Sequence, residues 1–207
     1  MNKPRIIVGL TGASGVIYGV RLLDLLAEAG AETHLVITPA GERTLAYETN
    51  LKINQVIARA HTHYPYTDIG AALASGSFRT GGMVIGCCSI RTMSEIATGV
   101  TANLLTRAAD VCLKERRPLV LMVRETPFHL GHLRTMAALS EMGAVIAPPL
   151  PAFYAQPQSI EEMIDQSVLR IIDLFGFEAP ALKRWGEDLK PARPGRAAGP
   201  RTKEESA

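Results

Sequence analysis

The feature near the start of the sequence that most restricts the fold is a short apolar run followed by a glycine-rich turn and an amphipathic stretch. The run is Arg5–Leu10, the turn is Thr11-Gly-Ala-Ser-Gly15, and residues 16–29 are predicted to form a helix. Strand, tight turn and helix make the first half of a βαβ unit, whose turn directs backbone N–H groups towards the positive end of the helix dipole. Such a turn attracts phosphate, although a purely structural tight turn is the alternative.

The spacing of the glycines argues against a nicotinamide dinucleotide. Gly9-x-x-Gly12-x-x-Gly15 differs from the G-x-G-x-x-G of dinucleotide-binding proteins, which also place an acidic residue about 20 positions further on. Here the second predicted strand is followed by Thr38-Pro39 and not by a carboxylate. The turn therefore favours another phosphate-bearing ligand.

The rest of the chain repeats the alternation of apolar strands and amphipathic helices. Residues 61–82 lose this periodicity and are predicted to be a long loop. The other predicted strands are 33–37, 83–88, 119–123 and 144–147, and the predicted helices are 42–48, 52–60, a stretch after Ser89, 101–114, 129–142 and 160–175. This pattern predicts an α/β fold with a doubly wound parallel sheet, Rossmann-like or flavodoxin-like, covered by helices on both faces.

Length and charge suggest one folded domain and a tail. The 207 residues divide into a predicted single domain, 1–189, and a basic segment, 190–207, that has almost no large apolar residues and is predicted to be disordered. That tail holds five Lys/Arg and two Asp/Glu, a charge of +3, so the total of +2 leaves −1 for the domain. A domain so close to neutral argues against nucleic-acid binding.

The sequence lacks the features of a membrane or secreted protein and those of a disulfide-rich or zinc-binding protein. No apolar run approaches the roughly 18 residues of a membrane span, and the first residues do not resemble a signal peptide, so a cytoplasmic protein is expected. Cys87, Cys88 and Cys112 form an odd set without CxxC spacing, which predicts neither a disulfide framework nor a zinc site.

In doubly wound sheets the ligand lies outside the carboxyl ends of the strands, so the residues that follow each strand are the candidates. Two hydroxyls in Ser89-Ile-Arg-Thr92 suit either a phosphate or a capped helix. Cys88 at the same junction is either a nucleophile with a lowered pKa or, as we favour, a small buried thiol. The charged pair in Arg124-Glu125-Thr126-Pro127 directly follows an apolar strand, a placement that favours function. The remaining candidates are Gly12–Gly15, Thr38 and residues 148–154.

Two other charged groups favour structural interpretations. Glu125, His129 and His132 have a spacing that suits a metal only on a continuous helix, and Pro127 lies between them, so no metal is expected. Lys114-Glu-Arg-Arg117 is typical of a solvated helix end, favourable to the helix dipole.

From Arg5 to about Trp185 the sequence resembles the UbiX flavin prenyltransferases, flavoproteins of the cysteine-decarboxylase-like fold. The motifs that carry the resemblance occur in order: Gly9-Leu-Thr-Gly-Ala-Ser-Gly15, Cys88-Ser-Ile-Arg-Thr92, Arg107-Ala-Ala-Asp-Val-Cys-Leu-Lys-Glu-Arg-Arg-Pro-Leu-Val-Leu121, Arg124-Glu-Thr-Pro127 and Pro151-Ala-Phe-Tyr154. Members of this family join a dimethylallyl group from its phosphate ester to N5 and C6 of reduced FMN, and the product is the cofactor of a UbiD-type decarboxylase. They form homododecamers with sites shared between subunits.

The resemblance implies a role for each candidate residue. FMN would be bound by Gly12, Ala13, Ser14, Thr38, Ser89, Ile90, Arg91, Thr92 and Arg124. The prenyl phosphate would be bound by Tyr154, Arg170, Arg107 and Lys114, with Glu125 at the same site. Glu48 would be a further active-site carboxylate, so the catalytic set is Glu125, Glu48, Lys114 and Arg107. The three cations would match the charge on the leaving phosphate without a metal, and either glutamate could relay a proton.

Two departures and two rival functions accompany the resemblance. The family often has Ser-Lys where this chain has Thr38-Pro39, and usually Pro where it has Cys87; each change keeps a hydroxyl at the turn, and the second alters the rigidity of the turn.

One rival is an FMN-dependent cysteine decarboxylase of the related fold, but the Pro-Ala-Ser-Ala-Asn-Thr and Pro-x-Met-Asn segments expected of it are missing from the sequence. The other is a non-catalytic flavin carrier, which would not need a second phosphate site.

Overall fold

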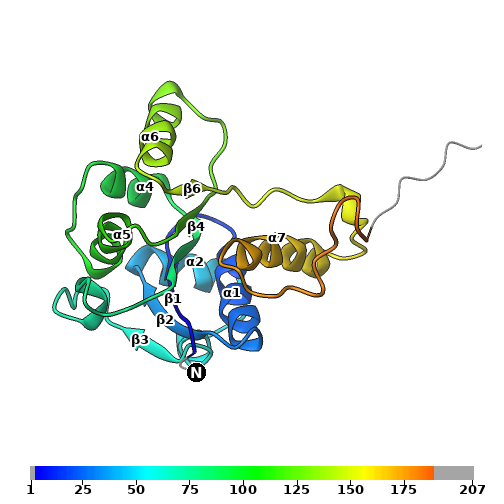
Figure 1. Ribbon diagram of the computed structural model, residues 1–207, viewed down its shortest axis with the longest axis horizontal. Coiled ribbons are helices and arrows are strands. Elements are labelled where there is room, and N and C mark those ends of the chain that lie inside the picture. The colour runs from blue at the N-terminus through cyan, green and yellow to red at the C-terminus, as the bar shows by residue number, and fades with distance from the viewer. Residues whose placement is uncertain (1–2, 189–207) are drawn as a thin grey trace, which may run out of the picture.

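A six-stranded parallel sheet organises the computed structural model, which describes residues 3–188 (Figure 1). The strand order is β3-β2-β1-β4-β5-β6, and every neighbouring pair is parallel. This order reverses between β1 and β4, as in Rossmann-type folds, so the predicted doubly wound sheet is confirmed. The strands are β1 (Arg5–Leu10), β2 (Glu32–Ile37), β3 (Thr62–Tyr64), β4 (Gly82–Cys88), β5 (Leu119–Val123) and β6 (Val145–Ile146).

The helices begin where polar side chains can cap them. At five helices the side chain of the preceding residue accepts a hydrogen bond from a backbone N–H of the first turn: Thr38, Ser89, Asn103, His129 and Ser159. The helices are α1 (Val16–Glu28), α2 (Pro39–Glu48), α3 (Ile53–Ile57), α4 (Ile90–Ala97), α5 (Leu104–Lys114), α6 (Leu130–Glu141) and α7 (Ile160–Leu174), with 3-10 turns η1 (Ala72–Ala74) and η2 (Phe153–Ala155).

Alternate residues of each strand point to opposite faces and build two cores. Ile6, Val8 and Leu10 of β1 belong to the core beneath α1 and α7, whereas Ile7 belongs to the core beneath α4 and α5. Figure 1 shows α1 and α7 on one side of the sheet and α4 and α5 on the other. Because both faces are covered, the central strands are buried along their length, which explains their nearly continuous apolar sequence.

A glycine contact brings α1 unusually close to β4. A Cβ atom added to Gly86 would lie 2.6 Å from the Cα atom of Gly19, and one added to Gly19 would lie 2.1 Å from a methyl group of Leu10. This approach is possible only without side chains at both positions. It places the start of α1 beside the end of β4, where the candidate residues lie.

The segment 61–82 is the main difference from the sequence prediction. It was expected to be loop, but Thr62–Tyr64 forms the edge strand β3, which pairs with β2 from His34 to Val36. Three half-buried residues are too few to produce a detectable alternation, and a hydrogen bond between Tyr64 Oη and His34 Nδ1 (3.0 Å) helps to hold the strand. The other strands and helices lie within a few residues of their predicted bounds.

The helices α3 and α5 are shorter than predicted. Helix α5 begins at Leu104 because Asn103 is its N-cap, and α3 covers Ile53–Ile57 of the predicted 52–60. Within residues 3–188, every helix is too short or too polar to cross a bilayer. The predicted disordered tail, 190–207, lies outside the described residues.

Candidate functional site

Two adjoining cavities lie at the carboxyl edge of the sheet, at the point where the strand order reverses. Both are lined by Gly12 and Ser89, which follow β1 and β4. We call the larger one, of about 710 Å³, the ring cavity. It is lined by Gly12, Ala13, Ser14, Ser89, Ile90, Val123, Arg124, Glu125, Thr126, Phe128, Pro148, Pro149 and Leu150. The smaller, about 230 Å³, is the phosphate cavity and is lined by Gly12, Thr38, Pro39, Ala40, Arg43, Tyr66, Ser89, Arg91, Thr92 and Glu95.

The phosphate cavity lies between the N-termini of two helices. The Thr38 side chain accepts from the N–H of Gly41 (3.0 Å) at the start of α2, and Ser89 Oγ accepts from the N–H of Thr92 (3.3 Å) at the start of α4. Arg43 and Arg91 add positive charge on the wall, although Arg91 also pairs with Glu95 (2.8 Å). Two helix dipoles, hydroxyls and guanidinium groups together suit an anion.

The N-terminus of α1 holds a carboxylate of the chain itself. Glu48, the last residue of α2, accepts hydrogen bonds from the backbone N–H groups of Gly15 (2.7 Å) and Val16 (3.1 Å). The sequence predicted a phosphate at this turn, and in the structure the amide of Gly15 and the first amide of α1, that of Val16, are paired with Glu48. The cavity that suits an anion lies instead between the starts of α2 and α4.

Thr11 and Cys87 join the two turns that line both cavities. Thr11 Oγ1 donates to the carbonyl of Cys87 (2.6 Å) and accepts from the N–H of Ser89 (2.9 Å), and Cys87 Sγ donates to the carbonyl of Gly15 (2.8 Å). Cys87 has a φ of 59°, in the left-handed region. The resemblance led us to expect proline at this position. Proline has its φ fixed near −65° and cannot adopt this conformation, so Cys87 changes the backbone path of the turn and not its rigidity alone.

The cysteines have no thiolate character. Burial raises the pKa of Cys87 to about 12 despite the opposing charge of Arg124, and burial also raises the pKa of Cys112 to about 12. Cys88 is fully buried, and its pKa is raised as well. These thiols are protonated at neutral pH, so the structure supports the buried-thiol interpretation of Cys88 over the nucleophile.

His129 and His132, which share a metal-like spacing with Glu125, make structural contacts at the start of α6. His129 Nδ1 accepts from the N–H groups of Gly131 (3.0 Å) and His132 (3.4 Å) and so caps α6, and the two histidine rings stack with centroids 3.6 Å apart. Among residues 3–188, no group of three or more His, Cys, Asp and Glu side chains is arranged to hold a metal.

Arg124 and Glu125 bring charge to an otherwise largely apolar ring cavity. They follow β5, and Glu125 Oε1 accepts from the N–H of Thr126 (2.8 Å). Tyr18, one helical turn after Gly15, lies close to Arg124 and Cys87, and burial raises the pKa of its phenol. Sequence reasoning missed several residues of the two cavities and their surroundings, among them Tyr18, Arg43, Tyr66, Glu95 and Phe128.

A third cavity, about 450 Å³, adjoins the ring cavity along Pro148–Leu150 and is lined by Tyr154 and Arg170. The Tyr154 ring packs edge to face against Trp185, with centroids 5.8 Å apart and planes at 82°. Arg170, on α7, pairs with Asp173 (2.7 Å). These two predicted substrate residues therefore share one cavity.

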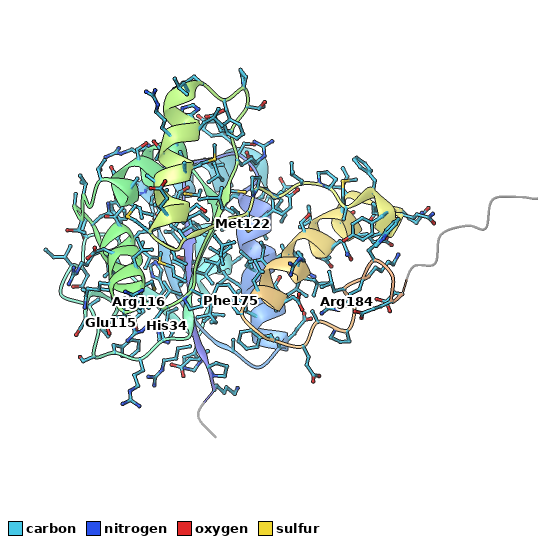
Figure 2. All side chains as sticks on the ribbon, turned by 45° about the horizontal axis from the view of Figure 1, so that its top comes forward. His34, Glu115, Arg116, Met122, Phe175 and Arg184 are labelled. Carbon is cyan, nitrogen blue, oxygen red and sulfur yellow. The ribbon has the colours of Figure 1, made fainter. Side chains whose placement is uncertain are left out.

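Arg107 and Lys114 lie elsewhere in the chain. Both are on α5, where Arg107 donates to the Ala74 carbonyl (3.2 Å) and pairs with Asp110 (2.6 Å), and Lys114 pairs with Glu115 (2.5 Å). Helices α5 and α7 cover opposite faces of the sheet. Figure 2 shows Glu115, next to Lys114, well separated from Arg184, which pairs with Asp173 of α7. One chain thus does not bring all four substrate residues together.

Comparison with known proteins identifies the family. Residues 1–171 match the profile of the Flavoprotein family. The flavin prenyltransferase UbiX of Thauera aromatica is 51% identical over 181 residues, which cover 87% of this chain and 93% of that protein.

Two solved structures share the fold. The crystal structure of AnUbiX (PadA1) in complex with FMN and dimethylallyl pyrophosphate has a TM-score of 0.88 at 44% identity and covers 89% of this chain and 98% of that one. The dodecameric FMN-dependent UbiX-like decarboxylase from Escherichia coli O157:H7 has a TM-score of 0.85 at 43% identity, over 87% and 98% of the two chains. The chain therefore belongs to the Flavoprotein family and, within it, to the UbiX flavin prenyltransferases.

Proposed function

We propose that this protein joins a dimethylallyl group from dimethylallyl phosphate to N5 and C6 of reduced FMN. The observation that carries the proposal is a cavity suited to an anion, between two helix N-termini, that shares Gly12 and Ser89 with a larger cavity lined by Arg124 and Glu125. The half-identical flavin prenyltransferase of Thauera aromatica supports the same activity. We further propose that the prenylated flavin is passed to a UbiD-type decarboxylase.

The residues at the carboxyl edge of the sheet fit FMN as the acceptor substrate. The hydroxyls of Thr38, Ser89 and Thr92, with the guanidinium groups of Arg43 and Arg91, would bind the phosphate. The isoalloxazine would lie in the ring cavity against the backbone of residues 12–14, beside Ile90 and Arg124. The volume of the ring cavity, about 710 Å³, suits a tricyclic ring with space for a small prenyl donor.

Two bonds to the flavin would form. The bond to N5 forms as the bond between the allylic carbon and the ester oxygen breaks and its electron pair leaves on the phosphate. The bond to C6 forms as one carbon of the remaining double bond takes up a proton and the other bonds C6, and the hydrogens of N5 and C6 are released as protons. Reduced FMN supplies the nucleophilic atoms. Arg107, Lys114 and Arg170 would balance the charge of the leaving phosphate, and the hydroxyl of Tyr154 would orient it. Phe128 and Pro148–Leu150 line the ring cavity with apolar side chains, which would face the electron-poor allyl group. Glu125 would hold the proton released as the ring is alkylated.

The separation of the substrate residues leads us to propose an assembly with shared sites. Arg107 and Lys114 are on α5, and Tyr154 and Arg170 are on the α7 side, so a second copy must supply part of the donor site. The dodecameric UbiX-like protein of Escherichia coli offers a precedent for a multimer of this fold. We infer a homo-oligomer, a dodecamer by this precedent.

The direct test is anaerobic incubation of the purified protein with reduced FMN and dimethylallyl phosphate, followed by mass spectrometry of the flavin. A prenylated flavin is expected, and its absence would refute the proposed activity. The same reaction with the diphosphate ester decides the choice of donor. Release of CO₂ from a peptidyl cysteine with oxidised FMN would instead favour the cysteine decarboxylase, and FMN binding without either product would favour a carrier.

A further inference from the structure

The turn after β1 and the turn after β4 are joined by a pair of side chains that we call the turn clamp, Thr11 and Cys87. Thr11 is 1% exposed, and its hydroxyl both donates to the Cys87 carbonyl (2.6 Å) and accepts from the Ser89 N–H (2.9 Å). Cys87 adds the second connection through its thiol, which donates to the Gly15 carbonyl (2.8 Å). The clamp therefore fixes where the two turns lie relative to each other.

The two turns have different tasks in the proposed site. Gly12 of the turn after β1 and Ser89 of the turn after β4 line both cavities. The turn after β1 also supplies Ala13 and Ser14 to the ring cavity, whereas Ser89 is the N-cap that fixes the start of α4, whose Arg91 and Thr92 line the phosphate cavity. The hydroxyl of Thr11 holds the backbone N–H of Ser89 directly. A shift of Ser89 would move the start of α4 relative to the ring cavity.

We propose that Thr11 is a positioning residue that holds the phosphate cavity in register with the ring cavity, so that one FMN molecule reaches both. The inference rests on the proposed function, because it assumes that FMN is the ligand. Thr11 faces neither cavity and acts through Ser89. Without its hydroxyl, the buried carbonyl of Cys87 and the partly buried N–H of Ser89 lose their partner, and the start of α4 is free to move away from the phosphate.

A positioning role and a purely stabilising role of Thr11 predict different changes in the affinities of two related ligands, FMN and riboflavin. FMN uses both cavities, and riboflavin, which lacks the phosphate, uses the ring cavity alone. Loss of register therefore weakens FMN far more than riboflavin. A general loss of structure weakens both ligands to the same degree.

The experiment compares Thr11→Val, which removes the hydroxyl at nearly constant volume, with Thr11→Ser, which keeps it. The matched control is Thr33→Val, because Thr33 is also 1% exposed and its hydroxyl accepts from one backbone N–H, that of His61 (3.1 Å), at the opposite edge of the sheet. Dissociation constants of FMN and riboflavin are measured by flavin fluorescence, and thermal midpoints are measured beside them.

Thr11→Val is expected to weaken FMN about tenfold or more and riboflavin less than about threefold, as the loss of a partner for two backbone groups would suggest. Thr11→Ser should restore the preference for FMN, and Thr33→Val should leave it unchanged while lowering the thermal midpoint. An unchanged ratio of the two constants in Thr11→Val, or an equal loss in Thr33→Val, would overturn the inference. A wild-type protein that binds neither flavin would refute the proposed function instead.

The second connection gives an independent measurement if Thr11→Val does not fold. Cys87→Gly removes the thiol donor and relieves the left-handed conformation at φ 59°, so the variant is expected to fold. The ratio of riboflavin to FMN dissociation constants should fall about twofold, less than in Thr11→Val, because only one hydrogen bond is lost and both hydrogen bonds of Thr11 remain. An unchanged ratio in this variant would also overturn the turn clamp.

Discussion

At the scale of the residue, Glu125 combines exposure to the ring cavity with a fixed local geometry. Its carboxylate accepts from the N–H of Thr126 (2.8 Å), and Arg124 precedes it on the same wall. Glu125→Gln keeps the size and the accepting oxygen but cannot take up a proton. We expect turnover to fall about 10²- to 10⁴-fold, the usual contribution of a positioned acid or base, with FMN affinity nearly unchanged.

Single-turnover formation of prenylated flavin measures the chemical step, and flavin fluorescence measures binding. Glu141→Gln is the control, because Glu141 ends α6 and lies outside the described cavities. If Glu125→Gln lost FMN affinity while retaining its rate at saturating FMN, Glu125 would be a binding residue and not the proton acceptor.

Arg43 is the second residue whose role the structure makes testable. It lies one turn into α2 on the wall of the phosphate cavity, beside the N-cap Thr38. Arg43→Ala should weaken FMN about three- to tenfold and leave riboflavin unchanged, since Arg43 lines the phosphate cavity and not the ring cavity. Titration of both flavins checks this, with the exposed Arg79 at the other edge of the sheet as the control. Equal weakening of FMN in Arg79→Ala would show a general charge effect.

Some of these residues follow from the sequence, and others do not. Gly12, Ser89, Arg124 and Glu125 could be predicted because parallel strands carry their ligand groups just after their carboxyl ends. Arg43 and Tyr18 lie one helical turn further along the chain, where a sequence pattern does not distinguish a solvent-facing side chain from a cavity-facing one. The capping of α1 by Glu48 also depends on the tertiary contact between α1 and α2.

At the scale of the element, the close approach of α1 to β4 positions both turns of the site. Gly86→Ala would place a methyl group 2.6 Å from the Cα atom of Gly19, where the neighbour is backbone and cannot rotate away. We expect a loss of about 1–3 kcal/mol in the free energy of unfolding, typical of overpacking, together with weaker flavin binding. Urea denaturation measures the first and fluorescence titration the second.

Gly70→Ala is the control for that substitution. Its added Cβ would meet only Asp68 Oδ1 at 3.6 Å, an ordinary contact, so the free energy of unfolding should change by less than about 0.5 kcal/mol. A wild-type stability in Gly86→Ala would mean that α1 can move away from the sheet without cost.

The elements themselves differ in how well the sequence predicts them. The buried strands β1, β4 and β5 are runs of five to seven residues with apolar side chains on both faces, so composition alone marks them. The edge strand β3 is set instead by pairing with β2 and by the contact between Tyr64 and His34, both of which join segments about 30 residues apart. No local pattern carries that information.

At the scale of the whole molecule, a buried histidine links stability to pH. His34 Nε2 contacts Glu32 (3.1 Å) and Nδ1 contacts Tyr64 Oη (3.0 Å), with Arg5 and His61 also near Glu32. Burial lowers the pKa of His34, although Glu32 opposes this. Below about pH 6.5 the unfolded chain therefore binds a proton that the folded one resists, so stability is complete above that pH and falls as the pH decreases.

Urea denaturation between pH 7.5 and 5 measures this dependence. One proton gives a slope of at most about 1.4 kcal/mol per pH unit, and His34→Gln should flatten the curve in this range. Glu32 contributes at lower pH, because Arg5, His34 and His61 lower its pKa in spite of burial. An unchanged slope in His34→Gln would assign the acid sensitivity to other groups.

The arrangement of the donor site predicts how two defective variants should behave when they assemble together. Lys114 is on α5 and Arg170 on α7, on opposite faces of the sheet, so the proposed donor site would draw them from different copies. Lys114→Ala and Arg170→Ala should each abolish most turnover. If each site takes one of these residues from each of two copies, random mixing in equal amounts leaves about a quarter of the sites with both cations. Turnover of the co-refolded mixture, compared with the two variants mixed without refolding, measures that fraction. A site contained in one chain would give no recovery, because every chain in the mixture lacks one of the two residues.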